Sequence, residues 1–230
     1  MTFKRTTRDY QVRINSLGIL KEPLICDNQF GSKTQAAINQ AMVYLKVQKP
    51  EQIFHPSGLN RIHLHWTAGD HLVTPIPGPN NDEADHYNDV FDLNGKHTPG
   101  IPVIDQAYYA SGSRGASHTL SANTGAIGLS VACMGDATYS GSVAKPGKWP
   151  INWVQVDAML KRAAEYCKMY DIRVSKWTVL SHAEVQPTLL IKQNGKWDIM
   201  ILPDNPQLVL DPVKAGDILR KRLVENFLNR

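Results

Sequence analysis

The chain has 230 residues, and 42% of them are hydrophobic, which is enough to bury a sizeable core in one domain, or in one domain with a small module. Its formal net charge of +4 is compatible with attraction to anionic polymers, but it does not distinguish cell wall, nucleic acid and membrane surface as partners. The three cysteines, Cys26, Cys133 and Cys167, are odd in number and far apart, which excludes a disulfide framework and a Cys-x-x-Cys zinc motif, so we expect packing residues.

Residues 1–50 are expected to form a small helical module. The run Ser32-Lys33-Thr34-Gln35 has the form of a capping box, which predicts that a helix begins there. Apolar residues follow at helical spacing, namely Ile38, Ala41, Met42 and Leu45. The polar segment 50–60 is interpreted as a linker, so that the main domain occupies residues 51–210 and a C-terminal helix residues 211–230.

The most informative run is the predicted strand 61–67. Alternation places His63 and His65 on one face of this strand and its apolar residues on the other. Gly69 follows in a predicted turn. Two imidazoles on one face, at the end of a buried strand and before a turn, are arranged as metal ligands are.

The remaining elements predict an α/β fold. Residues 74–85 contain too many prolines for a regular element and are expected to border a site. Residues 87–92 are a predicted strand, and residues 126–134 have the near-continuous apolar character of a buried central strand. A helix is expected from Asn152, its N-cap, to about residue 170, and a strand at 177–180 leads into a histidine. Strands separated by helices and long loops predict a mixed central β-sheet flanked by α-helices.

The C-terminal helix is predicted to be amphipathic and basic. Its apolar residues are Ile218, Leu219, Leu223, Phe227 and Leu228, and its basic residues include Lys214, Arg220, Lys221 and Arg222. A terminal helix docked on the domain is the favoured interpretation, and weak contact with a membrane surface is the alternative.

A candidate metal site can be assembled from residues far apart in the sequence. His65 ends one strand, His182 follows another, and Asp198 lies sixteen positions further on. Two imidazoles and one carboxylate leave an open position on a tetrahedral zinc ion, as in catalytic sites. The residues alone leave other readings open, including a metallohydrolase that uses His63 together with His65. For His63 we favour a role in the core or in supporting a ligand.

Five motifs in a fixed order carry a family resemblance. They are His65-Trp66-Thr67-Ala68-Gly69, the hairpin from Tyr87 to Gly95, the block from His118 to Gly128, the segment from His182 to Pro187, and Lys196-Trp197-Asp198. Over about residues 55–205 the chain resembles the zinc-dependent N-acetylmuramoyl-L-alanine amidases with the peptidoglycan-recognition-protein fold, which include phage endolysins. The resemblance implies a mixed α/β fold of that type, a Zn²⁺ cofactor and a peptidoglycan substrate.

The same resemblance implies which residues hold the metal. The family's three ligands fall on His65, His182 and Asp198, with Lys196 as the lysine that precedes the third ligand by two positions. The interval between the second and third ligands is longer than is usual in the family. We therefore expect residues 186–194 to bulge outward before the chain returns to the metal.

Further site residues are carried over in the same way. The family's active-site tyrosine falls on Tyr87. Some members place a glutamate general base where this chain has Ser130, so the activation of water is assigned to Tyr87 and Lys196. His118 is expected either to contact substrate or to serve as a hydrogen-bonded scaffold. Glu184 is expected either to accept a hydrogen bond near the metal or to be exposed.

The amino-terminal module has its own resemblance. The run from Cys26 to Ile38 resembles the Asp-x-x-Phe-Gly-x-x-Thr-x-x-Ala pattern of peptidoglycan-binding modules, and a helical cap on the main domain is the alternative. We expect a monomeric lytic amidase of the phage endolysin type, with no nucleic-acid partner. No signal peptide is evident, so we expect synthesis in the host cytoplasm and action on the cell wall in the periplasm or outside the cell. The rival reading is a non-catalytic peptidoglycan-binding protein of the same fold.

Overall fold

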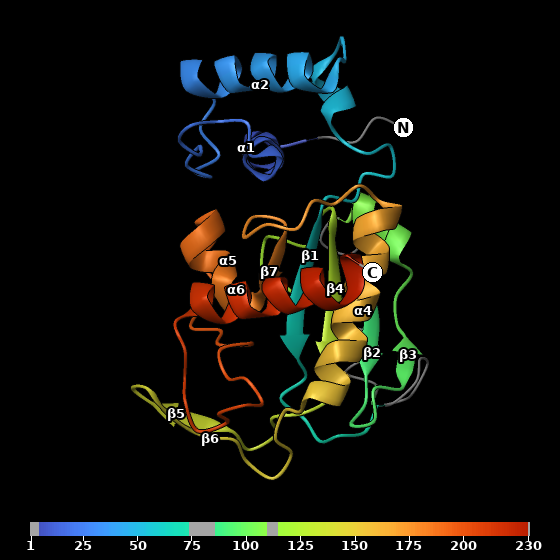
Figure 1. Cartoon of the computed structure of the whole chain (residues 1–230), viewed down its shortest axis with the longest axis vertical. Helices are drawn as coiled ribbons and strands as arrows, with labels where there is room; N and C mark the ends of the chain where they lie inside the picture. Colours follow the sequence, from blue (N-terminus) through green and yellow to red (C-terminus); the bar gives the residue numbers. More distant parts are fainter. Residues whose placement is uncertain (1–4, 74–85, 110–114, 230) are drawn as a thin grey trace.

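A five-stranded sheet lies at the centre of the computed structural model, which describes residues 5–73, 86–109 and 115–229 (Figure 1). The strand order is β3-β2-β4-β1-β7, in which β2–β3 is antiparallel and the other pairs are parallel. The strands are β1 (Arg61–Trp66), β2 (Asp89–Phe91), β3 (His97–Pro99), β4 (Ala126–Val131) and β7 (Val179–Ser181). The predicted mixed sheet is therefore confirmed, with β4 in its middle; the proline-rich loop expected at 74–85 lies outside the described residues.

Helices cover the sheet, which confirms the flanked α/β architecture. On one face, α4 (Trp153–Met169) packs against β2 and β4, and α6 (Pro212–Leu223) packs against α4 and β7 (Figure 1). The apolar residues of β1 and β4 pack into this layer. The predicted cap of α4 is confirmed, because the Asn152 side chain accepts from the Gln155 backbone N–H and the Gln155 side chain accepts in return. All three cysteines are free and buried, as expected.

The first fifty residues form two helices, α1 (Thr7–Leu17) and α2 (Ser32–Leu45). The helix begins at Ser32 as predicted, but the capping box is wrong: Gly31 is the N-cap and makes no side-chain cap bond. The expected linker is also partly structured. It begins with the 3-10 helix η1 (Pro50–Ile53), and Ile53 and Phe54 are buried in a small core with both helices.

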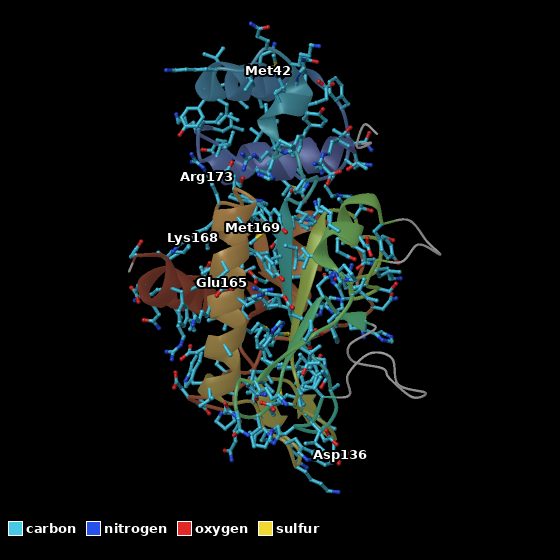
Figure 2. All side chains as sticks on the ribbon, turned by 90° about the vertical axis from the view of Figure 1, so that its right-hand side faces the viewer. Met42, Asp136, Glu165, Lys168, Met169 and Arg173 are labelled. Atoms are coloured by element: carbon cyan, nitrogen blue, oxygen red, sulfur yellow. The ribbon has the colours of Figure 1, made fainter. Side chains whose placement is uncertain are left out.

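Contacts cross the predicted boundary at residue 50. Figures 1 and 2 show α1 between α2 and the sheet. Val12 of α1 is fully buried in a cluster with Leu180 and Val185 of the main domain. Asp9 forms a buried ion pair with Arg61 at the start of β1, with 2.9 Å between Oδ1 and Nη1. The amino-terminal helices are thus fixed against the sheet that carries the candidate ligands.

The C-terminal helix is docked on the domain, as favoured from the sequence. Leu219 and Leu223 of α6 are fully buried, and the chain continues as the π-helix η3 (Val224–Leu228). Arg220 was expected on the polar face, yet it is only 6% exposed. No helix in the described ranges has the length and hydrophobicity needed to cross a membrane.

A hairpin and two short helices complete the fold. The hairpin of β5 (Thr138–Ser140) and β6 (Val143–Lys145) lies beyond the tips of β1 and β4 (Figure 1). The short helix η2 (Val103–Tyr108) packs against β4. The helix α5 (His182–Leu189) begins directly where β7 ends.

Candidate metal centre

Three predicted ligands converge at this edge of the sheet. His65 lies near the end of β1, and His182 opens α5 directly after β7, the parallel neighbour of β1. Asp198 follows α5, and its backbone carbonyl accepts from the Ala183 N–H, which holds it beside the helix start. The Nδ1 atoms of His65 and His182 lie 3.0 and 3.2 Å from the same oxygen, Oδ2 of Asp198. All three side chains are buried.

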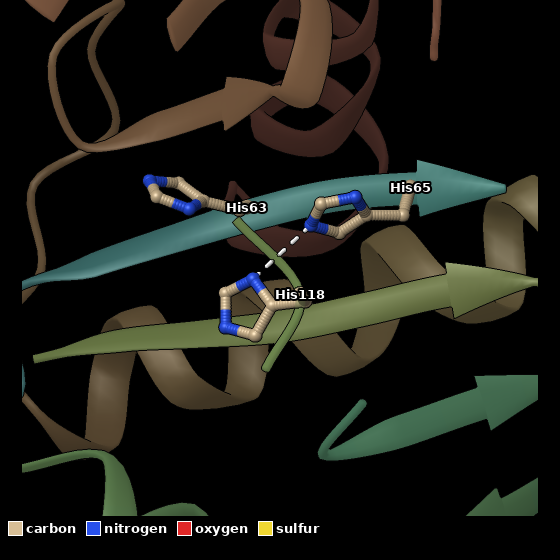
Figure 3. Close-up of side chains that lie close together, drawn as sticks. All are labelled: His63, His65 and His118. Carbon is tan, nitrogen blue, oxygen red and sulfur yellow. Dashed lines mark hydrogen bonds between the residues drawn. The ribbon is translucent and has the colours of Figure 1, made fainter. Parts of the chain in front are cut away.

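The proton on His65 can be assigned from its neighbours. Nε2 of His65 lies 3.2 Å from Nδ1 of His118, whose own Nε2 lies 3.1 Å from the Ala126 carbonyl oxygen (Figure 3). A carbonyl oxygen only accepts, so His118 carries its proton on Nε2 and accepts at Nδ1. Burial lowers the pKa of His118 well below its usual value and that of His65 to about 4, which keeps both rings neutral. Where His65 is the donor to that nitrogen, it donates from Nε2 and has a lone pair on Nδ1; the Thr119 hydroxyl, 2.9 Å from Nδ1 of His118, is the other donor within reach.

The same reasoning applies to His182. Its Nε2 lies 2.9 Å from Oε1 of Gln193, an amide oxygen that only accepts. In the neutral form with its proton on Nε2, His182 presents a bare Nδ1 to Asp198.

With both protons on Nε2, the three converging atoms are acceptors without a donor between them. Two imidazole lone pairs facing a carboxylate oxygen repel one another unless a cation lies among them. In a tetrahedral zinc site with bonds of about 2.0–2.1 Å, ligand atoms lie about 3.3 Å apart. The observed separations of 3.0 and 3.2 Å match that spacing, and all three ligand atoms lie within 4.8 Å of one another. The donor set therefore fits a zinc ion.

His63 belongs to a neighbouring hydrogen-bonded network. His63, His65 and His118 also bring nitrogen atoms within 4.8 Å of one another. However, the Thr119 hydroxyl lies 3.0 Å from Nδ1 of His63 and 2.9 Å from Nδ1 of His118. Hydrogen bonds thus account for both Nδ1 atoms, whereas Nε2 of His63 is buried without a hydrogen-bond partner among the described residues. Gly128 of β4 provides room for the His118 ring. The geometry favours a supporting position for His63 and a scaffold position for His118.

The candidate catalytic side chains lie beside the three ligands. The Tyr87 ring centroid is 5.2 Å from that of His65. Lys196 is exposed and lines a hollow of about 650 Å³ that also reaches His118 and His182. Apart from Leu120, the other lining residues have hydroxyl or amide side chains; they are Tyr109, Ser117, Thr119, Ser121, Asn123, Thr124, Gln193 and Asn194. A polar, hydroxylated ligand would find hydrogen-bond partners there.

Comparison with known proteins gives only weak structural likeness. No family model matches the chain, and no curated protein matches it. A similar solved structure is the Drosophila peptidoglycan recognition protein PGRP-SD, which is 16% identical. The likeness covers 61% of this chain and 76% of that protein, with a TM-score of 0.36. A likeness of this size carries no argument about function, which has to follow from the residues of the site.

Glu184 is not at the surface, which was one of its two sequence-based expectations. It is fully buried, so the surface alternative is wrong, and its partners are not the candidate ligands. Its carboxylate accepts from the Ser181 backbone N–H at 2.8 Å and pairs with Arg220 of α6, whose Nη2 lies 2.8 Å from Oε1. Gly216 of α6 lies directly against this carboxylate. Glu184 therefore anchors α6 to the start of α5.

The segment between His182 and Asp198 also differs from expectation. It was predicted to bulge outward over residues 186–194. Instead α5 continues to Leu189, and Gln193 then turns inward to His182. Sequence reasoning missed Gln193, and the only signal that could have indicated it was the unusual length of this interval. Ser130 lies opposite His65 in register and is buried, and its hydroxyl has no hydrogen-bond partner among the described residues.

Proposed function

We propose that this protein is a zinc-dependent amidase that hydrolyses the amide bond between N-acetylmuramic acid and L-alanine in peptidoglycan. The observation that carries the proposal is the convergence of three possible ligand atoms, Nδ1 of His65, Nδ1 of His182 and Oδ2 of Asp198, while Nε2 of each imidazole faces a hydrogen-bond partner on the far side. Such a set calls for a cation, and its three protein ligands match those of catalytic zinc sites. The sequence resemblance then indicates which amide is cleaved.

The chemistry divides between the metal and the chain. When bound, zinc would lower the pKa of a water molecule towards neutrality and polarise the scissile carbonyl. Lys196, on the rim of the hollow, would stabilise negative charge that develops on the substrate's carbonyl oxygen. Tyr87, beside His65, would orient the attacking water or pass a proton to the leaving amine. Ser130, at the family's glutamate position, has no carboxylate for that task.

The hollow beside the ligands fits part of a muropeptide. Its hydroxyl and amide groups can exchange hydrogen bonds with sugar hydroxyls and peptide amides, and Lys196 can pair with a carboxylate. We propose that the enzyme is monomeric and acts where peptidoglycan lies, in the periplasm or outside the cell, in lysis of the phage endolysin type. Contact of the C-terminal helix with a membrane is not part of this proposal, because the apolar residues Leu219 and Leu223 are buried in the core.

The amino-terminal helices offer a second place for the same polymer. A hollow of about 730 Å³ lies between the loop that follows α1 and the start of α2, lined in part by Leu20, Ile25 and Phe30. The sequence run that resembles peptidoglycan-binding modules forms much of this lining. We therefore propose that residues 1–50 bind cell wall and, through α1, present it at a fixed position relative to the catalytic hollow.

Digestion of purified murein tests the proposed function. The zinc-loaded protein should release stem peptides with a new L-alanine amino terminus, and His182→Ala should abolish that release. His55→Ala, at a histidine outside the ligand cluster, is the matched control and should retain activity. Binding of murein without any release of peptide would instead establish the non-catalytic alternative and overturn the amidase proposal.

A further inference from the structure

Gln193 occupies an unusual position in the segment between two candidate ligands. It is only 3% exposed, although its side chain is polar and the following residues Asn194, Gly195 and Lys196 are exposed. Buried polar groups are almost always hydrogen-bonded, so the partners of this amide show what it does. One of those partners is Nε2 of His182, 2.9 Å from Oε1.

The orientation of the Gln193 amide is fixed by its other partners. Its Nε2 lies 2.9 Å from the Leu120 carbonyl oxygen and 3.3 Å from that of Ile191. Both oxygens only accept, so the amide NH₂ has to face them and the amide oxygen has to face His182. A flipped amide would place three carbonyl oxygens together and lose both donated bonds. The backbone N–H of Gln193 also donates to Oε1 of Gln186, which ties the segment to α5.

The fixed amide decides between two forms of His182. In its neutral form the His182 imidazole has one N–H, and two acceptors compete for it: Oε1 of Gln193 at Nε2 and the carboxylate of Asp198 at Nδ1. If the proton lay on Nδ1, His182 would donate to Asp198 and could not bind a metal through that atom. With the proton on Nε2, the Nδ1 lone pair is available.

We propose that Gln193 is a positioning residue that selects the Nε2–H form of His182 and so prepares Nδ1 to bind the metal. The inference rests on the proposed zinc function for its purpose, but not for its geometry. Its bond to His182 is 0.3 Å shorter than the separation between His182 and Asp198, 2.9 against 3.2 Å. The interval that is long for the family thus contributes a side chain that acts on a ligand. Partners of this kind typically change metal affinity by about 10–100-fold.

Proton-detected nitrogen NMR of the metal-free protein tests this assignment directly. Couplings between ring nitrogens and carbon-bound protons distinguish the two forms of His182. Wild type should show the Nε2–H pattern, and Gln193→Met, which has similar size and no amide, should shift to Nδ1–H. Zinc affinity of Gln193→Met should fall by about 10–100-fold. Gln186→Ala, which loses only the bond that holds the segment on α5, is the matched control and should keep both the pattern and the affinity.

A second variant covers the case in which Gln193→Met fails to fold. Gln193→Glu keeps an accepting oxygen for His182, so it should retain the Nε2–H pattern even though it loses both donated bonds. An Nδ1–H pattern in the wild type, or an unchanged pattern and zinc affinity in Gln193→Met, would overturn the inference. Failure of the wild type to bind zinc would overturn the proposed function instead, while the NMR pattern would still decide the role of Gln193.

Discussion

Gly128→Ala should expose how tightly the histidine network is packed. A β-carbon on Gly128 would lie 2.4 Å from Cδ2, 2.5 Å from Cγ and 2.9 Å from Nε2 of His118, so the three nearest atoms all belong to one ring. Normal contacts between carbon atoms lie at about 3.5–4.0 Å, so the ring would have to move by about 1 Å. It is held on two sides, by the Ala126 carbonyl oxygen and by Nε2 of His65.

The magnitude follows from the bonds that such a movement breaks. Overpacking costs about 1–3 kcal/mol, and each of the two hydrogen bonds contributes about 1 kcal/mol. We therefore expect Gly128→Ala to lower the free energy of unfolding by about 3–5 kcal/mol. Without the clash the sign would be opposite, because alanine is favoured over glycine inside a strand by about 0.5–1 kcal/mol. Urea unfolding of the metal-free protein measures the difference.

A double-mutant cycle isolates the contact. His118→Ala removes all three of the atoms nearest to the added methyl group, so in that background Gly128→Ala should cost nothing or stabilise slightly. The coupling between the two sites should thus be at least about 3 kcal/mol. An equal cost of Gly128→Ala in both backgrounds, or a cost below about 0.5 kcal/mol in the wild type, would refute this account of the packing.

Three further changes test other parts of the structure. Gly216→Ala would place a methyl group against the buried Glu184 carboxylate and break its ion pair with Arg220. The folded protein should lose about 3–5 kcal/mol of stability, which thermal unfolding would measure. Burial raises the pKa of Asp9, but Arg61 and hydrogen bonds from Thr6 lower it further, and the net shift is downward. The Asp9–Arg61 ion pair therefore contributes to the free energy of unfolding above about pH 4, and this contribution is lost as the pH falls below that value. The free energy of unfolding should consequently fall more steeply with decreasing pH in the wild type than in Asp9→Asn. Lys196→Ala should reduce kcat on murein by about 10²–10³-fold with folding unchanged, and undiminished turnover would remove Lys196 from the mechanism.

The sequence predicted the elements that have strong local signals. The central strand at 126–134 reads as continuously apolar because it is covered on both faces, and the helix at Asn152 has reciprocal capping side chains. The N-cap was wrongly assigned to Ser32 because the actual N-cap is Gly31, which has no side chain by which the sequence could identify it. The convergence of the three candidate ligands was accessible only through motif order, since more than a hundred residues separate His65 from its partners.

Features that depend on long-range contacts were missed for physical reasons. Arg220 looks like part of a solvated basic face, and only the buried Glu184 reveals that it points inward. Gln193 looks like a surface residue in a polar loop, because nothing in the local pattern shows that His182 lies beside it. A side chain that satisfies a distant partner has no periodicity of its own, so it becomes visible only once the chain is folded.

X-ray absorption at the zinc edge tests the central claim most directly. The account predicts one zinc per chain, bound by two imidazoles and oxygen ligands, with zinc lost in Asp198→Ala and retained in His63→Ala. A first coordination shell with three imidazoles, or loss of zinc in His63→Ala, would place the metal in the neighbouring histidine group and contradict the account. So would a folded wild-type protein that binds no zinc.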